Sequence, residues 1–204
     1  MTINAAGNMP KGVAEEWQSI WAELVDLHSF WAFHRDLCGN SQHQILMEDI
    51  LPGPLLLIRR ACLTSIVMGV GRLFDKSKPT LSLSRLLATI KQQCPNNLAL
   101  QQNLKTMFNE AEICYWPMKA WRHQRFGHRN KAVALGMQPL PNVDEQSFDK
   151  VLSQLRKLLE AIHTHFNNPD TSMDFPIRRG DADDLMKYIR RGYEAEQAEI
   201  AALL

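Results

Sequence analysis

The sequence has few cysteines, and they lie far apart. None of the four stands in a C-x-x-C pair, and no cysteine–histidine group has zinc-finger spacing. Since no two histidines lie one helical turn apart beside an acid, we expect neither a metal ion nor another cofactor. Phosphate loops of the G-x-x-x-x-G-K-[ST] type and G-x-S-x-G nucleophile motifs are absent. Gly69-Val70-Gly71 is therefore not a phosphate loop, and we expect its glycines to allow close helix packing.

Net charge is low, and long uninterrupted apolar stretches are missing. The 23 Lys and Arg residues against 22 Asp and Glu residues leave +1, which excludes a uniformly basic nucleic-acid binder. The N-terminus lacks the apolar stretch of a signal peptide. The longest apolar stretch, residues 55–74, is interrupted by Arg59, Arg60 and Arg72. We therefore expect a cytoplasmic protein without a membrane span, whose thiols are reduced and mostly buried.

Alternating patterns typical of strands are also missing, whereas apolar residues recur at helical spacing along most of the chain. The predicted fold class is all-α, an irregular bundle of five to seven helices. The most apolar helix, residues 55–73, is expected to be central and buried on most sides. Helices are predicted for residues 13–37, 41–50, 55–73, about 80–93, 98 onward, 144–166 and 181–204.

Glycine and proline mark the boundaries of this organisation. Residues 1–12 are predicted to form a flexible N-terminal tail, and residues 13–204 a single domain, in keeping with about 100–200 residues per domain. The core of that domain is placed at about 13–167, followed by the C-terminal helix. Pro117 is expected to kink or restart the helix that contains it, and residues 130–143 are expected to form a loop.

Positive charge is concentrated in one stretch of the chain. Residues 113–143, here called the basic stretch, carry five basic residues and no acidic one, while residues 144–204 have a net charge of −4. Aromatic residues are interleaved with the bases: Tyr115, Trp116, Trp121 and Phe126. Basic side chains bind phosphates and rings stack on unpaired bases, so the stretch suits RNA contact. It also fits a solvated basic helix face with inward-packing aromatics, or a surface for an acidic partner protein.

Within the basic stretch, Arg122 and His123 are followed after four residues by His128. This R-H-x4-H pattern resembles the R-[N/D/H]-x(4–6)-H signature of the HEPN superfamily. Residues 129–131 (RNK) and the upstream residues 72–76 (RLFDK) resemble the abortive-infection, AbiU2-like branch of that superfamily. The motifs cover two short stretches, and the predicted all-α layout is compatible with an HEPN-like fold.

The resemblance implies a metal-independent endoribonuclease of a bacterial defence or toxin–antitoxin system. HEPN ribonucleases use the 2′-OH of RNA as the internal nucleophile. By resemblance, His128 is the acid/base, Arg122 stabilises the phosphate, and His123 helps to position them. The residue types suit these roles, because an imidazole titrates near neutral pH and an arginine stays charged.

The resemblance also implies the partners. These are RNA, such as tRNA or mRNA, a second copy in a homodimer whose two motifs form a composite site, and an antitoxin or regulator protein. The RNA-binding candidates are the other bases of the basic stretch: Lys119, Arg125, Arg129 and Lys131. Residues six positions apart on a straight α-helix are about 120° from facing the same way. Arg122 and His128 therefore need an irregular backbone to converge, and Gly127 is placed to loosen or end the helix.

Two other functions fit the same residues. The first is a catalytically inactive HEPN-like helical module that binds RNA or a partner protein, in which Arg122 pairs with Asp75 or another acid to fix the helices. The second is a helical protein outside this superfamily whose basic stretch meets an acidic partner.

Overall fold

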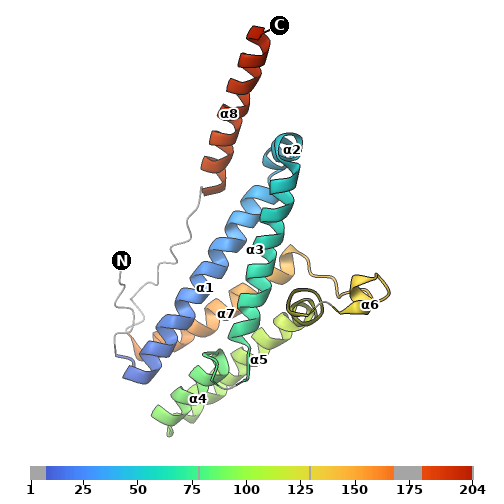
Figure 1. Cartoon of the computed structure of the whole chain (residues 1–204). Coiled ribbons are helices and arrows are strands. Elements are labelled where there is room, and N and C mark those ends of the chain that lie inside the picture. The colour runs from blue at the N-terminus through green and yellow to red at the C-terminus, as the bar shows by residue number, and fades with distance from the viewer. Residues whose placement is uncertain (1–7, 78, 129, 168–180, 204) are drawn as a thin grey trace. The chain divides into compact units, whose positions relative to one another are not determined.

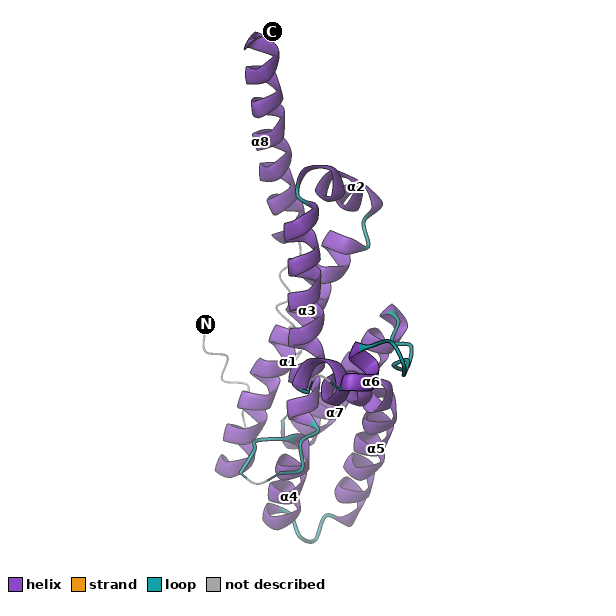
Figure 2. Cartoon of the chain, turned by 45° about the vertical axis from the view of Figure 1, so that its right-hand side comes forward, coloured by secondary structure: helices purple, strands orange, loops and turns teal. Residues whose placement is uncertain are grey.

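The computed structural model describes residues 8–77, 79–128, 130–167 and 181–203 (Figure 1). These residues form eight α-helices and one π-helix and contain no strand, which confirms the all-α prediction (Figure 2). The helices are α1 (Lys11–Cys38), α2 (Ser41–Ile50), α3 (Pro52–Leu73), α4 (Leu83–Gln93), α5 (Leu98–Trp121), the π-helix η1 (Arg122–Gly127), α6 (Lys131–Ala134), α7 (Glu145–Phe166) and α8 (Asp181–Leu203).

Polar side chains mark several of the helix starts. Asn40, Asn97 and Asp144 accept hydrogen bonds from the first backbone N–H groups of α2, α5 and α7. Asn130 does the same for α6, where its Oδ1 accepts from the N–H groups of Ala132 and Val133. This cap explains why a single helical turn forms inside residues 130–143, which were expected to be a loop.

The N-terminal boundary differs from the predicted one. α1 begins at Lys11, because the Ala14 N–H already donates to the Pro10 carbonyl at 2.9 Å. Met9 is buried, and the Asn8 N–H donates to the Asn167 side chain. Ordered structure therefore starts inside the segment predicted as a tail, whose first seven residues lie outside the described part of the chain.

The chain divides into two compact units, and α1 and α3 contribute residues to both. Unit 1 comprises Met1–Leu27 and Ile66–Phe175, and unit 2 comprises His28–Ser65 and Pro176–Leu204. The expectation of a single domain stays a prediction.

The core of unit 1 is built from the apolar faces of its helices. Trp17 of α1 is fully buried, stacks on Trp21 and donates from its indole Nε1 to the Leu159 carbonyl of α7. The stripe of α7 is buried along its whole length, as its period of apolar residues predicts. α5 packs along α7, so α7 supports the helix that leads into η1.

The core of unit 2 is a smaller cluster. Leu37 of α1, Met47 of α2 and Leu55 of α3 pack against Ala182 and Met186 at the start of α8. The His43 imidazole of α2 lies 3.4 Å from the Asp183 carboxylate, which also ties α2 to α8. Only the first turns of α8 are therefore held by this core.

His34 is buried in unit 2 with 6% of its surface exposed, and neither ring nitrogen has a hydrogen-bond partner among the described residues. Burial, helped by the Arg59 charge, lowers the pKa of His34 to about 4. An unfolded histidine binds its proton near pH 6.5, so stability is complete above that pH and is lost as pH falls toward 4.

We expect acid to destabilise the folded chain through this histidine. Between about pH 7 and pH 4, protonation should remove about 3 kcal/mol of the free energy of unfolding. His34→Phe keeps a ring stacked on Trp31 and should remove that share of the pH dependence. Urea unfolding at several pH values measures it, and parallel curves for wild type and variant would contradict the prediction.

α3 is less buried than its apolar sequence predicts. Ile66, Val67 and Val70 are fully buried in unit 1, but Leu56 and Leu57 are 65% and 69% exposed. The reason is that only part of the apolar surface of α3 meets a partner helix. Among the described helices, α3 is also the one long and apolar enough to cross a membrane, a property that core helices share. The cytoplasmic location stays a prediction.

Candidate active site

The motif lies where α5 changes its helical geometry. α5 continues through Pro117 without ending there, and at Arg122 the chain passes into the π-helix η1. The His128 N–H donates to the His123 carbonyl at 3.2 Å, five residues earlier, which is the hydrogen bond of a π-helix. Gly127 makes this turn possible, because a Cβ atom there would lie 2.9 Å from the Arg122 carbonyl oxygen. The expected loosening at Gly127 is therefore a widened turn.

The Arg122 side chain turns toward the connection between α3 and α4. Its Nη2 lies 3.1 Å from Oδ2 of Asp75, and its side chain is 21% exposed. This ion pair joins the two short stretches that carry the family resemblance, although they lie far apart in the sequence. It is also the pairing weighed for the catalytically inactive alternative.

The Asp75 carboxylate is held in place by Ser77 as well as by Arg122. The Ser77 hydroxyl and the Ser77 N–H both donate to Oδ1 of Asp75, at 2.5 and 2.9 Å. These two bonds, followed by the Arg122 guanidinium, lower the pKa of Asp75 to about 2. The carboxylate therefore stays ionised throughout the physiological range, and it fixes one corner of the guanidinium.

Two residues that sequence reasoning did not assign to the site shape the position of Arg122. Tyr115 lies seven residues earlier, on the same face of α5, is buried, and stacks on Phe74. Its hydroxyl lies beside the guanidinium, and burial raises the pKa of that hydroxyl. Gly71 of α3 leaves the space for Arg122, because a Cβ atom there would lie 2.3 Å from the Arg122 Cδ. Two features of the sequence could have indicated these roles. They are the G-x-G of residues 69–71 within a helix and the seven-residue spacing between Tyr115 and Arg122.

Gly71→Ala is expected to displace Arg122 from Asp75 and to cost about 1–3 kcal/mol of folding stability through overpacking. Gly192→Ala, inside α8, is the control, because no atom lies within 4 Å of its added Cβ. That control should be neutral or slightly stabilising, since alanine favours a helix. Urea unfolding of both variants measures the difference, and equal midpoints would contradict the close approach at Gly71.

Both motif histidines are exposed on this turn. Partial loss of hydration, followed by the positive charges of Arg122 and Lys119, lowers the pKa of His123. The His123 ring is therefore neutral near pH 7. His128 follows η1 with an extended backbone, at φ −133° and ψ 132°, so its side chain is not bound to the helical direction of α5.

We expect an NMR titration to place the pKa of His123 below 6.5 in the wild type. Lys119→Gln removes one of the positive charges that lower this pKa, so the value should rise in that variant. Lys157→Gln on α7 is the control and should leave it unchanged. A His123 pKa that stays the same in Lys119→Gln would show that Lys119 does not act on this ring.

The remaining bases of the basic stretch are engaged to different degrees. The Arg125 guanidinium lies 4.8 Å from the centre of the Trp121 ring and 5.9 Å from that of Phe126, as cation–π contacts. Lys119 lies 5.3 Å from the Trp116 ring centre. Lys131 is exposed at the start of α6. Arg129, the fourth RNA-binding candidate, lies outside the described residues.

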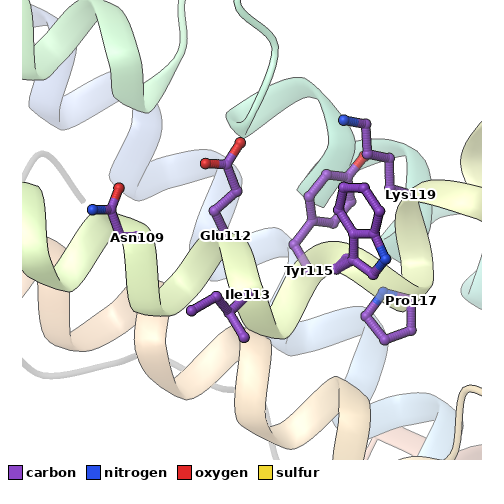
Figure 3. A pocket seen from close by; sticks show the side chains of 7 residues that line it. Asn109, Glu112, Ile113, Tyr115, Pro117 and Lys119 are labelled. Carbon is purple, nitrogen blue, oxygen red and sulfur yellow. The ribbon is translucent and has the colours of Figure 1, made fainter.

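A surface groove of ≈ 500 Å³ runs along α5 beside this turn. Its walls include Ile113 and Trp116, which are 73% and 67% exposed. Glu112 and Lys119 project from the same side of α5, while Ile113 points to the other side (Figure 3). Within the described part of the chain, no group of three or more His, Cys, Asp or Glu side chains could hold a metal ion.

The fold and the motif together define an all-α protein of the HEPN type. A family model described as AbiU2, of the HEPN group, matches residues 11–185, and the chain belongs to this family. An HEPN-type domain of an abortive-infection family indicates a role related to defence. No curated protein and no solved structure matches the sequence.

Proposed function

We propose that this protein is a metal-independent endoribonuclease of a bacterial defence or toxin–antitoxin system. The observation that carries the proposal is the π-turn of the family motif, which presents exposed His123 and His128 next to an arginine oriented by Asp75. All three motif residues lie in a stretch of the chain that carries five basic residues and no acidic one, which favours binding of an RNA phosphate.

Arg122 is assigned to stabilise the phosphate. Asp75 contacts one of the two terminal nitrogens of Arg122, Nη2. A guanidinium carries five N–H donors on three nitrogens, so the ion pair orients the group and leaves donors for a phosphate oxygen. Asp75 is thus a positioning residue. Its negative charge is opposed by the Arg122 guanidinium itself.

His128 is assigned as the acid/base. It takes the proton from the 2′-OH, whose oxygen then bonds to the adjacent phosphorus while the bond from phosphorus to the 5′-oxygen breaks. The protonated His128 then gives that proton to the leaving 5′-oxygen, so the products are a 2′,3′-cyclic phosphate and a 5′-OH. No oxidant, metal or cofactor is needed for the balance. His123, neutral near pH 7, helps to position the groups by hydrogen bonding.

The partners follow from the same proposal. RNA, such as tRNA or mRNA, is the substrate, and Lys119, Arg125, Arg129 and Lys131 are candidates to hold its backbone. A second copy of the chain supplies a second motif in a homodimer, and an antitoxin or regulator protein restrains the activity.

The test incubates the purified full chain with total RNA and with tRNA in the presence of EDTA. We expect cleavage products with 2′,3′-cyclic phosphate and 5′-OH ends, because the reaction uses no metal and an internal nucleophile. Cleavage that EDTA abolishes, or products with 3′-OH ends, would contradict the proposed chemistry.

One observation favours a second function, that of a catalytically inactive HEPN-like module. Arg122 and Arg125 both have partners within the chain, Asp75 for the first and the rings of Trp121 and Phe126 for the second. If the protein is a binding module, the folded chain should bind RNA or a partner protein without cleaving RNA. Fluorescence anisotropy with labelled RNA, run beside the cleavage assay, distinguishes the two functions.

A further inference from the structure

α8 carries an apolar stripe with the spacing of a coiled-coil seam. Positions along it alternate four and three residues apart, which keeps them on one face of the helix. All except one are apolar or aromatic. The stripe consists of Ala182, Met186, Ile189, Tyr193, Glu196, Ile200 and Leu203.

Only the first part of this stripe is covered in the structure. Ala182 and Met186 are 1% and 2% exposed and belong to the core of unit 2, and Ile189 is half-buried against that core. Further along the same continuous helix, Tyr193, Ile200 and Leu203 are 37%, 46% and 87% exposed (Figure 1). The stripe therefore continues from a packed surface to one without a partner among the described residues.

The charges of α8 are separated along its length. Residues 187–191 carry three basic residues and no acid, while residues 192–203 carry three acidic residues and no base. The bases are Lys187, Arg190 and Arg191, and the acids are Glu194, Glu196 and Glu199. Each half of the exposed helix is thus complementary in charge to the other half.

We propose that α8 pairs with α8 of a second copy of this chain in an antiparallel coiled coil. An antiparallel arrangement centred between residues 193 and 196 sets the basic segment of one helix beside the acidic segment of the other. It places Ile189 opposite Ile200 and Tyr193 opposite Glu196, so the tyrosine hydroxyl can donate to the single carboxylate of the stripe. A parallel arrangement would set Glu196 against Glu196, which is repulsive.

The charge pattern also favours a second copy of α8, rather than a membrane surface, as the partner of this stripe. An acidic helix end is repelled by an anionic membrane surface, whereas a second α8 brings its own basic segment. The match to the AbiU2 family ends at residue 185, so the part of the stripe from Met186 onward lies outside the matched residues. The pairing is therefore a separate contact from the homodimer that the HEPN resemblance implies, and it does not rest on ribonuclease activity.

The first test measures self-association of the full chain by sedimentation velocity over a range of concentrations. Ile200→Asp places a charge in the stripe and is expected to weaken association by at least about tenfold, because a buried isoleucine contributes more than that factor. Ala198→Asp is the matched control, since it adds the same charge on the opposite face of the same helix. It should associate like the wild type.

The second test fixes the direction of pairing. A mixture of Ile189→Cys and Ile200→Cys chains, oxidised gently, should give a mixed disulfide dimer, identified by peptide mass. Wild type controls for the native cysteines, none of which lies in α8. Parallel pairing would instead crosslink Ile200→Cys chains to one another.

Three results would overturn the proposal. They are a wild type that sediments as a monomer throughout, an Ile200→Asp variant that associates as strongly as Ala198→Asp, and Ile200→Cys self-crosslinking without the mixed product. The first leaves the stripe to a different partner, and the second places the contact between copies elsewhere on the chain.

Discussion

Replacing His128 with alanine is expected to lower the rate of RNA cleavage by about 10²–10⁴-fold, the usual contribution of a positioned acid/base. The side chain is exposed after the π-turn, outside the apolar core of unit 1, so the variant should fold like the wild type. Single-turnover cleavage of a labelled RNA, beside a thermal unfolding curve, measures both effects.

The matched control for that variant is His165→Ala. His165 is also an exposed histidine of unit 1, and its Nε2 lies 3.3 Å from the Asn97 side-chain nitrogen. It should retain cleavage. Added imidazole should restore part of the activity of His128→Ala, because a small imidazole can take over proton transfer. Full activity in His128→Ala would remove this residue from the chemistry.

Arg122→Ala is expected to lower the cleavage rate by about 10²–10³-fold, the effect of removing one donor that stabilises the charge on a reacting oxygen. The variant also leaves the Asp75 carboxylate without its arginine, so a loss of stability is expected alongside. Since Ser77 still donates two hydrogen bonds to that carboxylate, the fold should persist.

Arg85→Ala separates the two effects of losing an arginine. Arg85 of α4 forms a comparable ion pair, with Nε 2.8 Å from the Glu16 carboxylate, and lies outside the motif. It should lose some stability and keep its activity. If Arg122→Ala likewise loses stability but cleaves RNA at the wild-type rate, the Arg122–Asp75 pair serves only to fix the helices, as in the catalytically inactive alternative.

Much of the helical layout follows from local features of the sequence. The amphipathic stripe of α7 and the side chains of Asn40, Asn97 and Asp144 predict where helices lie and begin, because these features act within a few residues. The exposure of Leu56 and Leu57 was not predictable in this way. It depends on which helices meet α3, and apolar composition alone does not encode that.

The candidate site was likewise predictable only in part from the sequence. The R-H-x4-H spacing and the need for an irregular backbone at Gly127 are visible in the sequence. The π-turn itself is a shift of hydrogen-bond partners, which residue types only permit. The roles of Gly71 and Tyr115 depend on the approach of α3 to the end of α5, so they required the three-dimensional arrangement.

The most direct measurement compares two short RNA substrates that differ by one oxygen. After a cleavage position has been mapped, an oligonucleotide with a single 2′-deoxy substitution on the 5′ side of that phosphate is incubated with the wild-type chain in EDTA. Attack by the 2′-OH predicts that cleavage at this position disappears while other positions are still cut. Cleavage of the 2′-deoxy substrate at the same phosphate and at an equal rate would contradict the proposed mechanism.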